Sequence, residues 1–463
     1  MTVARSRGAL GGVAIVVATV AATLSWSTSA SASGFAAAHF GGEHGSVVET
    51  NPLALYYNPG GIGFSEGAHF YIDGTIALRG GSWDHPLAPT DPTPDPPGGE
   101  GANNGKATFF NVFGGPALGA TMRLGNFALG AGLFVPFGGR ESWDTNDRFT
   151  NSQFPLAAAG VQRWHIIDGA ITFIYGTVGA AYRLGPVSLG VSGNLVLGSV
   201  QQNQAKNPNA SGLPDTLREG RANLDVSGVT GSFGIGAMVE AVPKRLWLGA
   251  SYQSQPNMGA QTMNGKLTIT SQTGSLASDV TFTNALPDVL RAGARWRVHD
   301  ALELRLYGDY TRWSVVKSQC VALKGYPCAV YADGSDASGG GVLSNFKRDW
   351  KDTFGVHGGG SVWVKPTLEL FAGAGYETAA TTDANLDPSI ADADNISLAG
   401  GVRVFAFDWI YVGASYTHLY FFDRDNTGKS ALASYAYPTQ QQDGGGKYTQ
   451  WVGFFNINLE KTF

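Results

Sequence analysis

The stretch that indicates the fold of this chain most clearly reads LRAGARWRVHDALELRLYGDY, residues 290–310. Apolar residues occupy every second position on both sides of the short segment Val298-His299-Asp300, and mostly charged or small residues fill the positions between them. Period-two hydrophobicity is typical of a strand with one apolar face. A connection this short joins such strands into an antiparallel hairpin. We therefore predict two paired strands here, each with an apolar face and a polar face.

The same alternation recurs from Gly67 onward, for example over residues 396–404 and 410–417. Tight turns are expected near residues 124–125, 185–186, 242–244, 298–300, 365–366 and 407–408. Long polar connections are expected at residues 80–106, 137–168, 201–221, 263–280, 315–350, 377–394 and 422–447. Six short and seven long connections join fourteen strands, and they place both chain ends on the side of the short turns.

This alternation favours an all-β fold that crosses a membrane. Outer-membrane barrels combine an even number of antiparallel strands with short periplasmic turns and long external loops. The predicted strands, of roughly 11 to 15 residues, are long enough for a tilted crossing, which takes about 9–11 residues. We predict a 14-stranded antiparallel transmembrane β-barrel over residues 67–463, a multi-pass protein of the bacterial outer membrane with both termini in the periplasm.

The two ends of the chain fit an exported barrel. Arg5 and Arg7 precede an apolar run over residues 8–24, and small residues follow at 30–32, so residues 1–33 are predicted to be a signal peptide. At the other end, apolar and polar residues alternate up to the terminal Phe463. Such a last strand resembles the recognition signal of bacterial outer-membrane barrels, which makes the barrel assembly machinery and outer-membrane lipids expected partners.

Composition argues against several other classes of protein. Only 14% of the 463 residues are charged and the formal net charge is -5, whereas a nucleic-acid-binding surface would be basic. A mean hydropathy of -0.05 excludes a multispanning helical membrane protein. The chain carries no complete G-x-S-x-G, P-loop, G-x-G-x-x-G or H-E-x-x-H motif, so we expect no enzyme activity, no cofactor and no metal site.

Residues 34–66 precede the first predicted strand and contain the motif Asn58-Pro59-Gly60-Gly61 among many apolar residues. The segment resembles the N-terminal hatch, or plug, of the FadL-type family, bacterial outer-membrane transporters of long-chain fatty acids and other hydrophobic compounds. Further similarity lies at residues 136–138, 287–288, 310–314, 350–353 and 383–394. The departure is His39-Phe-Gly-Gly-Glu-His44, where the family more commonly has serine and glycine.

The residues alone also favour a hatch. A fourteen-stranded barrel is wider than the eight-stranded kind whose own side chains fill its interior, so an empty lumen would be a water channel. The other interpretation of residues 34–66 is a disordered periplasmic tail, but such a tail would carry fewer apolar residues. We predict a hatch inside the lumen.

The resemblance implies a transport route for hydrophobic small molecules, such as fatty acids or hydrocarbons. They would be captured at external loops, bind in the lumen, and leave laterally through the barrel wall after the hatch moves. In the family the exit lies where the third strand kinks inward, which corresponds here to residues 126–136. Gly130, Gly132 and Pro136 are the candidates for this opening, because glycine weakens strand pairing and proline lacks an N–H. The alternative function is a general diffusion porin or a structural outer-membrane barrel.

Six charged residues of the predicted hairpin 290–310 are expected to face the lumen. A cationic residue that faced lipid at mid-depth of the membrane would destabilise the barrel by about 2–4 kcal/mol. They are Arg291, Arg295, Arg297, Glu303, Arg305 and Asp309. Two interpretations stay open: a network of ion pairs that braces the barrel, or an unpaired arginine that holds a carboxylate headgroup.

Two features of the external loops carry separate predictions. Cys320 and Cys328 lie eight residues apart in an exported loop, which favours a local disulfide over free thiols. The four aspartates of the segment 383–394 could bind calcium through oxygen ligands, although a solvated loop explains them more simply. They are Asp383, Asp387, Asp392 and Asp394.

Overall fold

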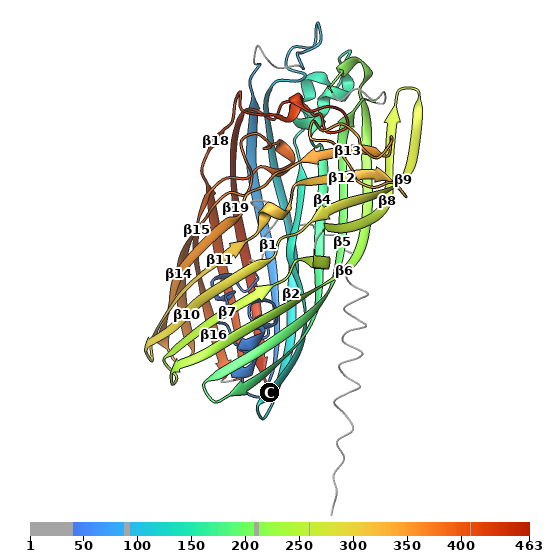
Figure 1. Ribbon diagram of the computed structural model, residues 1–463. Helices are drawn as coiled ribbons and strands as arrows, with labels where there is room; N and C mark the ends of the chain where they lie inside the picture. The colour runs from blue at the N-terminus through green and yellow to red at the C-terminus, as the bar shows by residue number, and fades with distance from the viewer. Residues whose placement is uncertain (1–39, 88–92, 208–212, 259, 408) are drawn as a thin grey trace, which may run out of the picture.

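The computed structural model describes residues 40–463 apart from residues 88–92, 208–212, 259 and 408 (Figure 1). The predicted signal peptide therefore lies outside the described residues. One sheet closes on itself as a barrel (Figure 1). Its fourteen strands are β1 (Ala68–His85), β2 (Gly105–Leu124), β3 (Phe127–Ser142), β4 (Asp168–Leu184), β5 (Val187–Lys206), β6 (Gly220–Val242), β7 (Leu246–Gln253), β10 (Val289–His299), β11 (Leu302–Thr311), β14 (Thr353–Lys365), β15 (Leu368–Glu377), β16 (Asn395–Phe407), β17 (Ile410–Phe421) and β19 (Lys447–Thr462).

Each barrel strand pairs antiparallel with the next one along the chain, and the last pairs with the first. Ile72 of β1 lies opposite Leu459 of β19 on one side and opposite Leu118 of β2 on the other. Because every barrel strand has two partners, no strand is left with one side unpaired along its whole length, which lipid could not satisfy. The predicted all-β fold with fourteen antiparallel strands is confirmed.

Five further strands lie in the long connections: β8 (Ala260–Ser271), β9 (Gly274–Ala285), β12 (Ser318–Leu323), β13 (Val342–Lys347) and β18 (Arg424–Asp425). The prediction that residues 263–280 are a loop is wrong, because they form most of the β8–β9 hairpin. The predicted loop 201–221 is also too long, since β5 runs to Lys206 and β6 starts at Gly220. Polar residues on both faces, such as Gln201 and Gln202, conceal the strand period in these outer parts.

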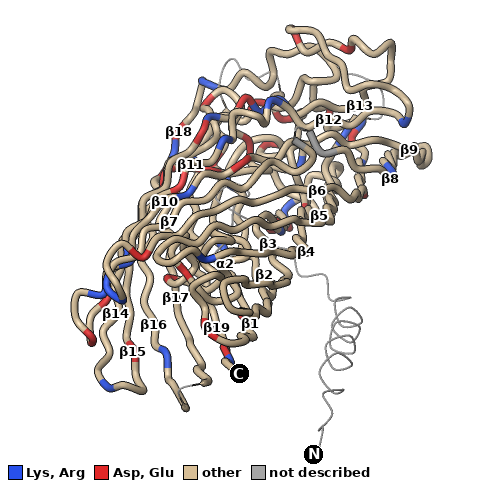
Figure 2. Tube along the Cα trace, turned by 60° about the horizontal axis from the view of Figure 1, so that its bottom comes forward, with Lys and Arg blue, Asp and Glu red and all other residues tan. Residues whose placement is uncertain are grey.

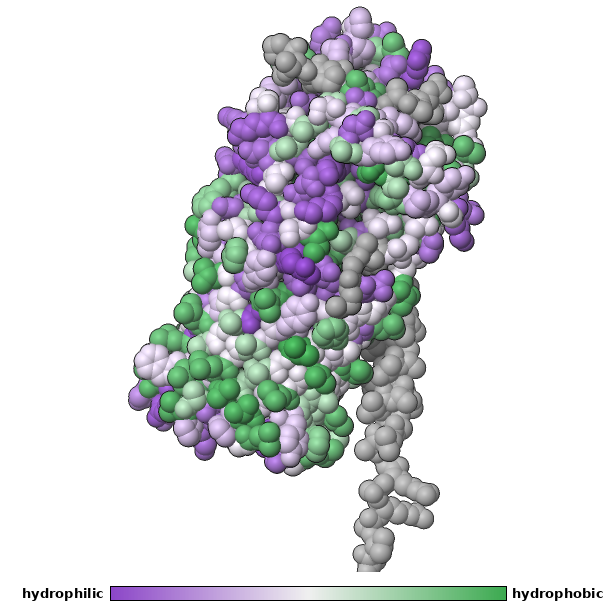
Figure 3. All heavy atoms as spheres, viewed as in Figure 1, coloured by the Kyte–Doolittle hydropathy of each residue, from purple (hydrophilic) through white to green (hydrophobic). Residues whose placement is uncertain are grey.

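The barrel wall has an apolar outer face and a polar inner face. In β5, Leu189, Val191 and Leu195 are exposed, whereas Ser192 and Asn194 between them are buried. Hydrophobic side chains dominate the lower half of the visible face, and hydrophilic ones gather above, toward the long connections (Figure 3). This arrangement suits a wall that lipid surrounds on the side of the short turns. Within the described ranges, no helix is long and apolar enough to cross a membrane.

The described part of the predicted hatch, residues 40–66, lies inside the lumen, where Figure 2 shows its helix among the barrel strands. It consists of the short helices η1 (Gly42–His44), α2 (Ala54–Tyr57) and η2 (Pro59–Phe64). Leu53, Leu55 and Ile62 have no exposed surface. The predicted position of the hatch within the barrel is confirmed.

The motif Asn58-Pro59-Gly60-Gly61 fixes the hatch to the wall. The Asn58 side chain accepts a hydrogen bond from the Gly60 backbone N–H at 3.0 Å, and its amide donates to Val47 O at 2.8 Å and to Ala237 O at 3.0 Å. A Cβ on Gly60 would lie only 2.9 Å from the Gly236 carbonyl oxygen, and one on Gly61 would collide with the Glu49 carbonyl. Close approach, rather than a positive φ, therefore explains both glycines.

The long connections fold into a cover held by ion pairs and a disulfide. Arg163 forms a buried pair with Glu219 at 2.9 Å, and Arg424 bonds the partly exposed Asp383 at 2.8 Å. A disulfide joins Cys320 to Cys328. The four aspartates of segment 383–394 do not gather around one point: Asp383 and Asp387 pair with different arginines, while Asp392 and Asp394 accept hydrogen bonds from separate backbone N–H groups.

Candidate transport pathway

The barrel wall is interrupted between β2 and β3. Their ladder begins at Leu124 opposite Phe127 and stops at Leu118 opposite Leu133. Beyond that point β3 continues to pair with β4, with a shift in register between Phe134 and Phe137. The next hydrogen bond between the two sides runs from the Ser142 N–H to the Asn111 side chain at 3.1 Å, and the next one between backbone groups runs from the Asp144 N–H to Thr108 O at 2.9 Å. We call the unpaired part, residues 112–117 of β2 and 134–141 of β3, the window.

Each side of the window contains a proline. Pro136 lies in β3 where the register shifts, and Pro116 lies in β2 just past the last ladder pair. Neither residue can donate a ladder hydrogen bond, so pairing between these strands is weak where they meet. Sequence analysis missed Pro116, although a proline after Gly114-Gly115 inside a predicted central strand was a visible signal.

The other two candidates for a lateral opening lie outside the window. Gly130 pairs with Thr121, and Gly132 pairs with Gly119, both within the intact ladder. The third strand also continues to Ser142, beyond the expected end at residue 136. Of the three candidates, the structure places only Pro136 at the interruption.

Aromatic residues of the hatch lie against the inner side of the window. The ring of Phe40 lies 5.3 Å from that of Phe134 and 5.2 Å from that of Tyr56. A small apolar recess at the window is lined by Phe40, Ala77, Phe113, Gly115, Pro116 and Val135, among others. The hatch and the window therefore form one contact surface.

A larger space, the hatch cavity, lies on the inner side of Pro136 and Phe137. It encloses about 950 Å³, its open mouth included, and Tyr56 and Tyr57 of α2 form part of its lining. Its charged residues are Glu43, Arg291, Asp309, His357 and Glu377. The cavity connects the polar interior of β10 and β11 with the inner edge of the window.

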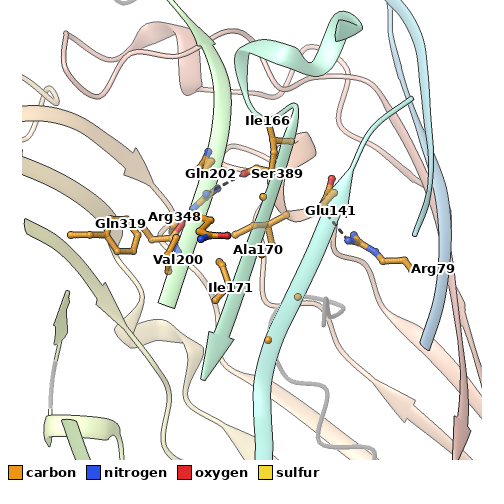
Figure 4. A pocket seen from close by; sticks show the side chains of 16 residues that line it. Arg79, Glu141, Ile166, Ala170, Ile171, Val200, Gln202, Gln319, Arg348 and Ser389 are labelled. Carbon is orange, nitrogen blue, oxygen red and sulfur yellow. Dashed lines mark hydrogen bonds and ion pairs between the residues drawn. The ribbon is translucent and has the colours of Figure 1, made fainter. Parts of the chain in front are cut away.

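A second space, the outer cavity, lies higher in the lumen and encloses about 620 Å³, its mouth included (Figure 4). Its apolar lining includes Ile166, Ile171, Val200 and Phe282. Two arginines reach it, each paired with a carboxylate: Arg79 bonds Glu141 at 3.1 Å, and Arg348 bonds Asp387 at 2.6 Å. The outer cavity thus combines an apolar wall with fully paired charges.

The carboxylate of Asp387 keeps its charge despite complete burial. Burial alone would raise the pKa of Asp387, but the Arg348 guanidinium and hydrogen bonds from Ser389 outweigh burial and hold that pKa below its usual range. Since Ser389 N–H donates to Asp387 Oδ1 at 2.7 Å and Arg348 to Oδ2, both carboxylate oxygens have partners.

The unusual hatch sequence Glu43-His44 anchors η1 to the barrel. His44 Nε2 lies 2.9 Å from Glu369 Oε1, and Arg403 lies 3.8 Å from the other oxygen of the same carboxylate. Glu43 lies 3.9 Å from Arg305. Sequence analysis had no reason to pair these residues, which are separated by hundreds of positions.

The six predicted lumenal charges lie on the inner face of β10 and β11, but they do not form one network. Arg305 pairs with Glu303 at 3.0 Å and with the hatch, while Arg295 and Arg297 lie over the rings of Trp247 and Trp363. Arg291 and Asp309 line the hatch cavity. Arg291 donates to the Tyr56 hydroxyl at 3.2 Å, which links the barrel wall to α2.

Comparison with known proteins identifies the family. A family model described as "Outer membrane protein transport protein (OMPP1/FadL/TodX)" matches residues 13–449. The chain belongs to this family. No curated protein sequence matches the chain.

Several solved structures share the fold of this FadL/TodX member. A Pseudomonas aeruginosa FadL homologue is 17% identical, with 94% of this chain and 99% of that chain covered and a TM-score of 0.70. The Ralstonia pickettii toluene transporter TbuX is 16% identical, with 92% and 97% covered and a TM-score of 0.62. The Pseudomonas putida toluene transporter TodX is 14% identical, with 92% and 97% covered and a TM-score of 0.61.

Family membership settles the general function. The chain is a β-barrel of the bacterial outer membrane that transports hydrophobic compounds, and it is not an enzyme.

Proposed function

We propose that this transporter passes hydrophobic compounds from its external loops through the lumen to the window, where they leave sideways into the outer membrane. The interrupted ladder between β2 and β3 carries this proposal. The route would run from the outer cavity to the hatch cavity, which Pro136 and Phe137 border, and then past Val135 and Pro116.

Sideways release has a thermodynamic reason. An apolar molecule gains about 25 cal/mol for each Å² that it removes from water, so lipid is a better destination than the periplasm. The direct route to the periplasm is filled by the hatch, whose Leu53, Leu55 and Ile62 are completely buried. The window would let the molecule pass from the lumen into lipid without entering the periplasm.

The hatch would act as the gate of this route. Its Phe40 ring packs on Phe134 at the window, so movement of this part of the hatch would uncover the inner side of the window. The anchors at His44 and Glu43 lie in the same short segment and would limit how far it moves.

A general diffusion porin is the alternative function, and uptake measurements separate the two. N-phenyl-1-naphthylamine is a neutral dye that fluoresces in membranes. We expect cells that produce the protein to take it up about tenfold faster than matched cells without the protein. A tenfold increase corresponds to a free-energy barrier to entry that is lower by about 1.4 kcal/mol. Liposomes that contain the protein should show no increase in swelling with raffinose. A porin would give the opposite pattern, with rapid raffinose entry and unchanged dye uptake.

The proposed direction of transport requires the long connections to face outward. We expect a peptide tag inserted at Pro94, within the long β1–β2 connection, to bind antibody on intact cells. A tag at Gly185, in the short β4–β5 turn where even an added Cβ meets no neighbour, should bind antibody only after the outer membrane is permeabilised. Labelling of the Gly185 tag on intact cells would reverse the orientation.

A further inference from the structure

The two ends of the window are held in different ways. At the end nearer the short turns, the regular ladder between β2 and β3 stops at Leu118 opposite Leu133. At the outer end, toward the long connections, the Ser142 N–H of β3 donates to the side chain of Asn111 on β2 at 3.1 Å. A side-chain oxygen thus takes the place that a backbone carbonyl has in a regular ladder. The outer end is therefore held by a side chain and not by the sheet itself.

An ion pair reinforces this outer end from the lumen. Arg79 of β1 lies opposite Asn111 of β2 in the ladder, yet its guanidinium reaches past β2 to Glu141 of β3 at 3.1 Å (Figure 4). Trp143 Nε1 donates to the other oxygen of the Glu141 carboxylate at 2.5 Å. Arg79 also donates to Gln450 of β19 at 2.9 Å. The ion pair thus connects β3 to β1 across the side of β2 where the ladder is interrupted.

These contacts are shielded from water. Arg79, Asn111 and Glu141 have only 1%, 6% and 5% of their surface exposed. The Arg79 guanidinium lies 4.8 Å from the centre of the Phe109 ring, and that ring packs edge-on against Trp143 at 4.7 Å. Charge-assisted hydrogen bonds are stronger in such a site than at a surface. We call Arg79, Asn111 and Glu141 the clasp.

The next contact outward from the clasp is weaker. The Asp144 N–H donates to Thr108 O at 2.9 Å, and the Thr108 hydroxyl donates to the Asp144 carboxylate at 2.5 Å. Both residues are exposed. Because water competes for hydrogen bonds at the surface, these bonds resist separation of the two strands less than the buried clasp does. Without the clasp, the unpaired length of β2 would therefore extend from Asn111 toward Thr108.

The clasp also borders the outer cavity. Arg79 and Glu141 belong to the lining of this cavity, together with Gly138 and Gly139 of the window (Figure 4). The two glycines present only backbone to the cavity. The outer cavity therefore meets the window along this part of β3, next to the clasp.

We propose that the clasp limits the size of the molecules that leave through the window. The inference rests on the proposed lateral exit and adds the device that regulates its width. A slit that is tied at both ends opens only as far as its free length lets its sides bow apart. At about 3.3 Å per residue, the slit spans roughly 23 Å from Asn111 to Leu118. The three clasp residues are positioning residues, because they act on a passing molecule through the place where they hold β3.

Two dyes of different size test the clasp in cells that produce the full chain. N-phenyl-1-naphthylamine is the smaller dye, and Nile red is a wider uncharged fluorophore. Uptake by matched cells without the protein is subtracted for each. The double variant Arg79→Met with Glu141→Gln removes both charges together, so no buried charge is left unpaired. We expect its ratio of Nile red uptake to N-phenyl-1-naphthylamine uptake to exceed that of the unaltered protein at least about fivefold.

A milder variant and a matched control accompany the double variant. Asn111→Leu keeps a side chain of similar size but removes the acceptor of the Ser142 N–H, and should raise the same ratio about threefold, as for one lost neutral hydrogen bond. The control, Arg163→Met with Glu219→Gln, alters an ion pair that is just as buried, with 0% and 1% of its side chains exposed, but lies in the long connections. It should leave the ratio unchanged. Heat-modifiable migration on gels verifies that each variant is a folded barrel.

The outcomes separate this inference from the proposed transport. An unchanged ratio in the folded clasp variants would overturn the inference, while continued uptake of N-phenyl-1-naphthylamine would still support lateral exit. An equal fall in the uptake of both dyes would show that the clasp only braces the barrel, which also overturns the inference. If the unaltered protein takes up neither dye, the proposed function fails and the inference fails with it.

Discussion

Deleting residues 35–60 is expected to convert a nearly closed barrel into an open channel that still folds. The fourteen strands close through their own ladder, so none of the barrel pairings depends on the hatch. A barrel of this width without a plug holds a water-filled lumen, and we expect its single-channel conductance in planar bilayers to rise by at least about tenfold. Selective uptake of the neutral dye should fall at the same time, because the guided route would be lost.

The deletion also removes a large apolar contribution to stability. Leu53 and Leu55 are completely buried, and burial of such a side chain contributes about 1.5–3 kcal/mol. The shortened barrel should therefore lose its heat-modifiable form at a lower temperature than the intact protein. A matched control replaces residues 270–275, at the exposed tip of the β8–β9 hairpin, by Asn-Gly and should leave the conductance unchanged. Unchanged conductance after removal of residues 35–60 would show that the segment does not plug the barrel.

Locking the window shut should abolish most transport. A Cβ placed on Gly115 would lie 3.9 Å from the Cβ of Val135, which falls within the range of about 3.5–4.5 Å found in disulfides. The double variant Gly115→Cys with Val135→Cys should therefore form a disulfide during export, since the compartment is oxidising. The new bond would tie β2 to β3 across the window and prevent its sides from separating.

We expect this lock to slow uptake of the neutral dye at least about tenfold, a barrier increase of about 1.4 kcal/mol or more. Each single cysteine variant is a control for the effect of the new side chain alone. The unaltered protein treated with reductant is a second control, because reduction also opens the native bond between Cys320 and Cys328. To verify that the new bond has formed, the protein is cleaved between the two new cysteines. The two fragments should migrate together on a gel before reduction and separately after it.

The barrel itself could be predicted from sequence because lipid imposes a simple rule on every strand. Outward residues such as Leu189 and Val191 must be apolar, while inward residues such as Ser192 meet the polar lumen, and this alternation is visible without any knowledge of partners. The rule fails beyond the membrane. Both faces of the outer strand segments are polar there, so the β8–β9 hairpin was mistaken for a loop.

The route through the barrel could be predicted only in part. Pro136 was recognised through its family resemblance, but the window also depends on Pro116, and its extent depends on where two ladders stop. The ion pairs that anchor the hatch and neutralise the outer cavity join residues far apart in the chain, such as His44 with Glu369 and Arg79 with Glu141. Their pairing follows from barrel register and loop folding, which leave no local pattern in the sequence.

Lateral exit is the central claim, and cells that produce the Gly115→Cys and Val135→Cys double variant test it most directly. The measurement is the rate of N-phenyl-1-naphthylamine uptake after reduction divided by the rate before reduction. We predict a ratio of about ten or more, with a ratio near one in both single variants and in the unaltered protein, because only the double variant has a bond across the window. A ratio near one in a double variant whose disulfide is shown to form would contradict lateral exit through the window.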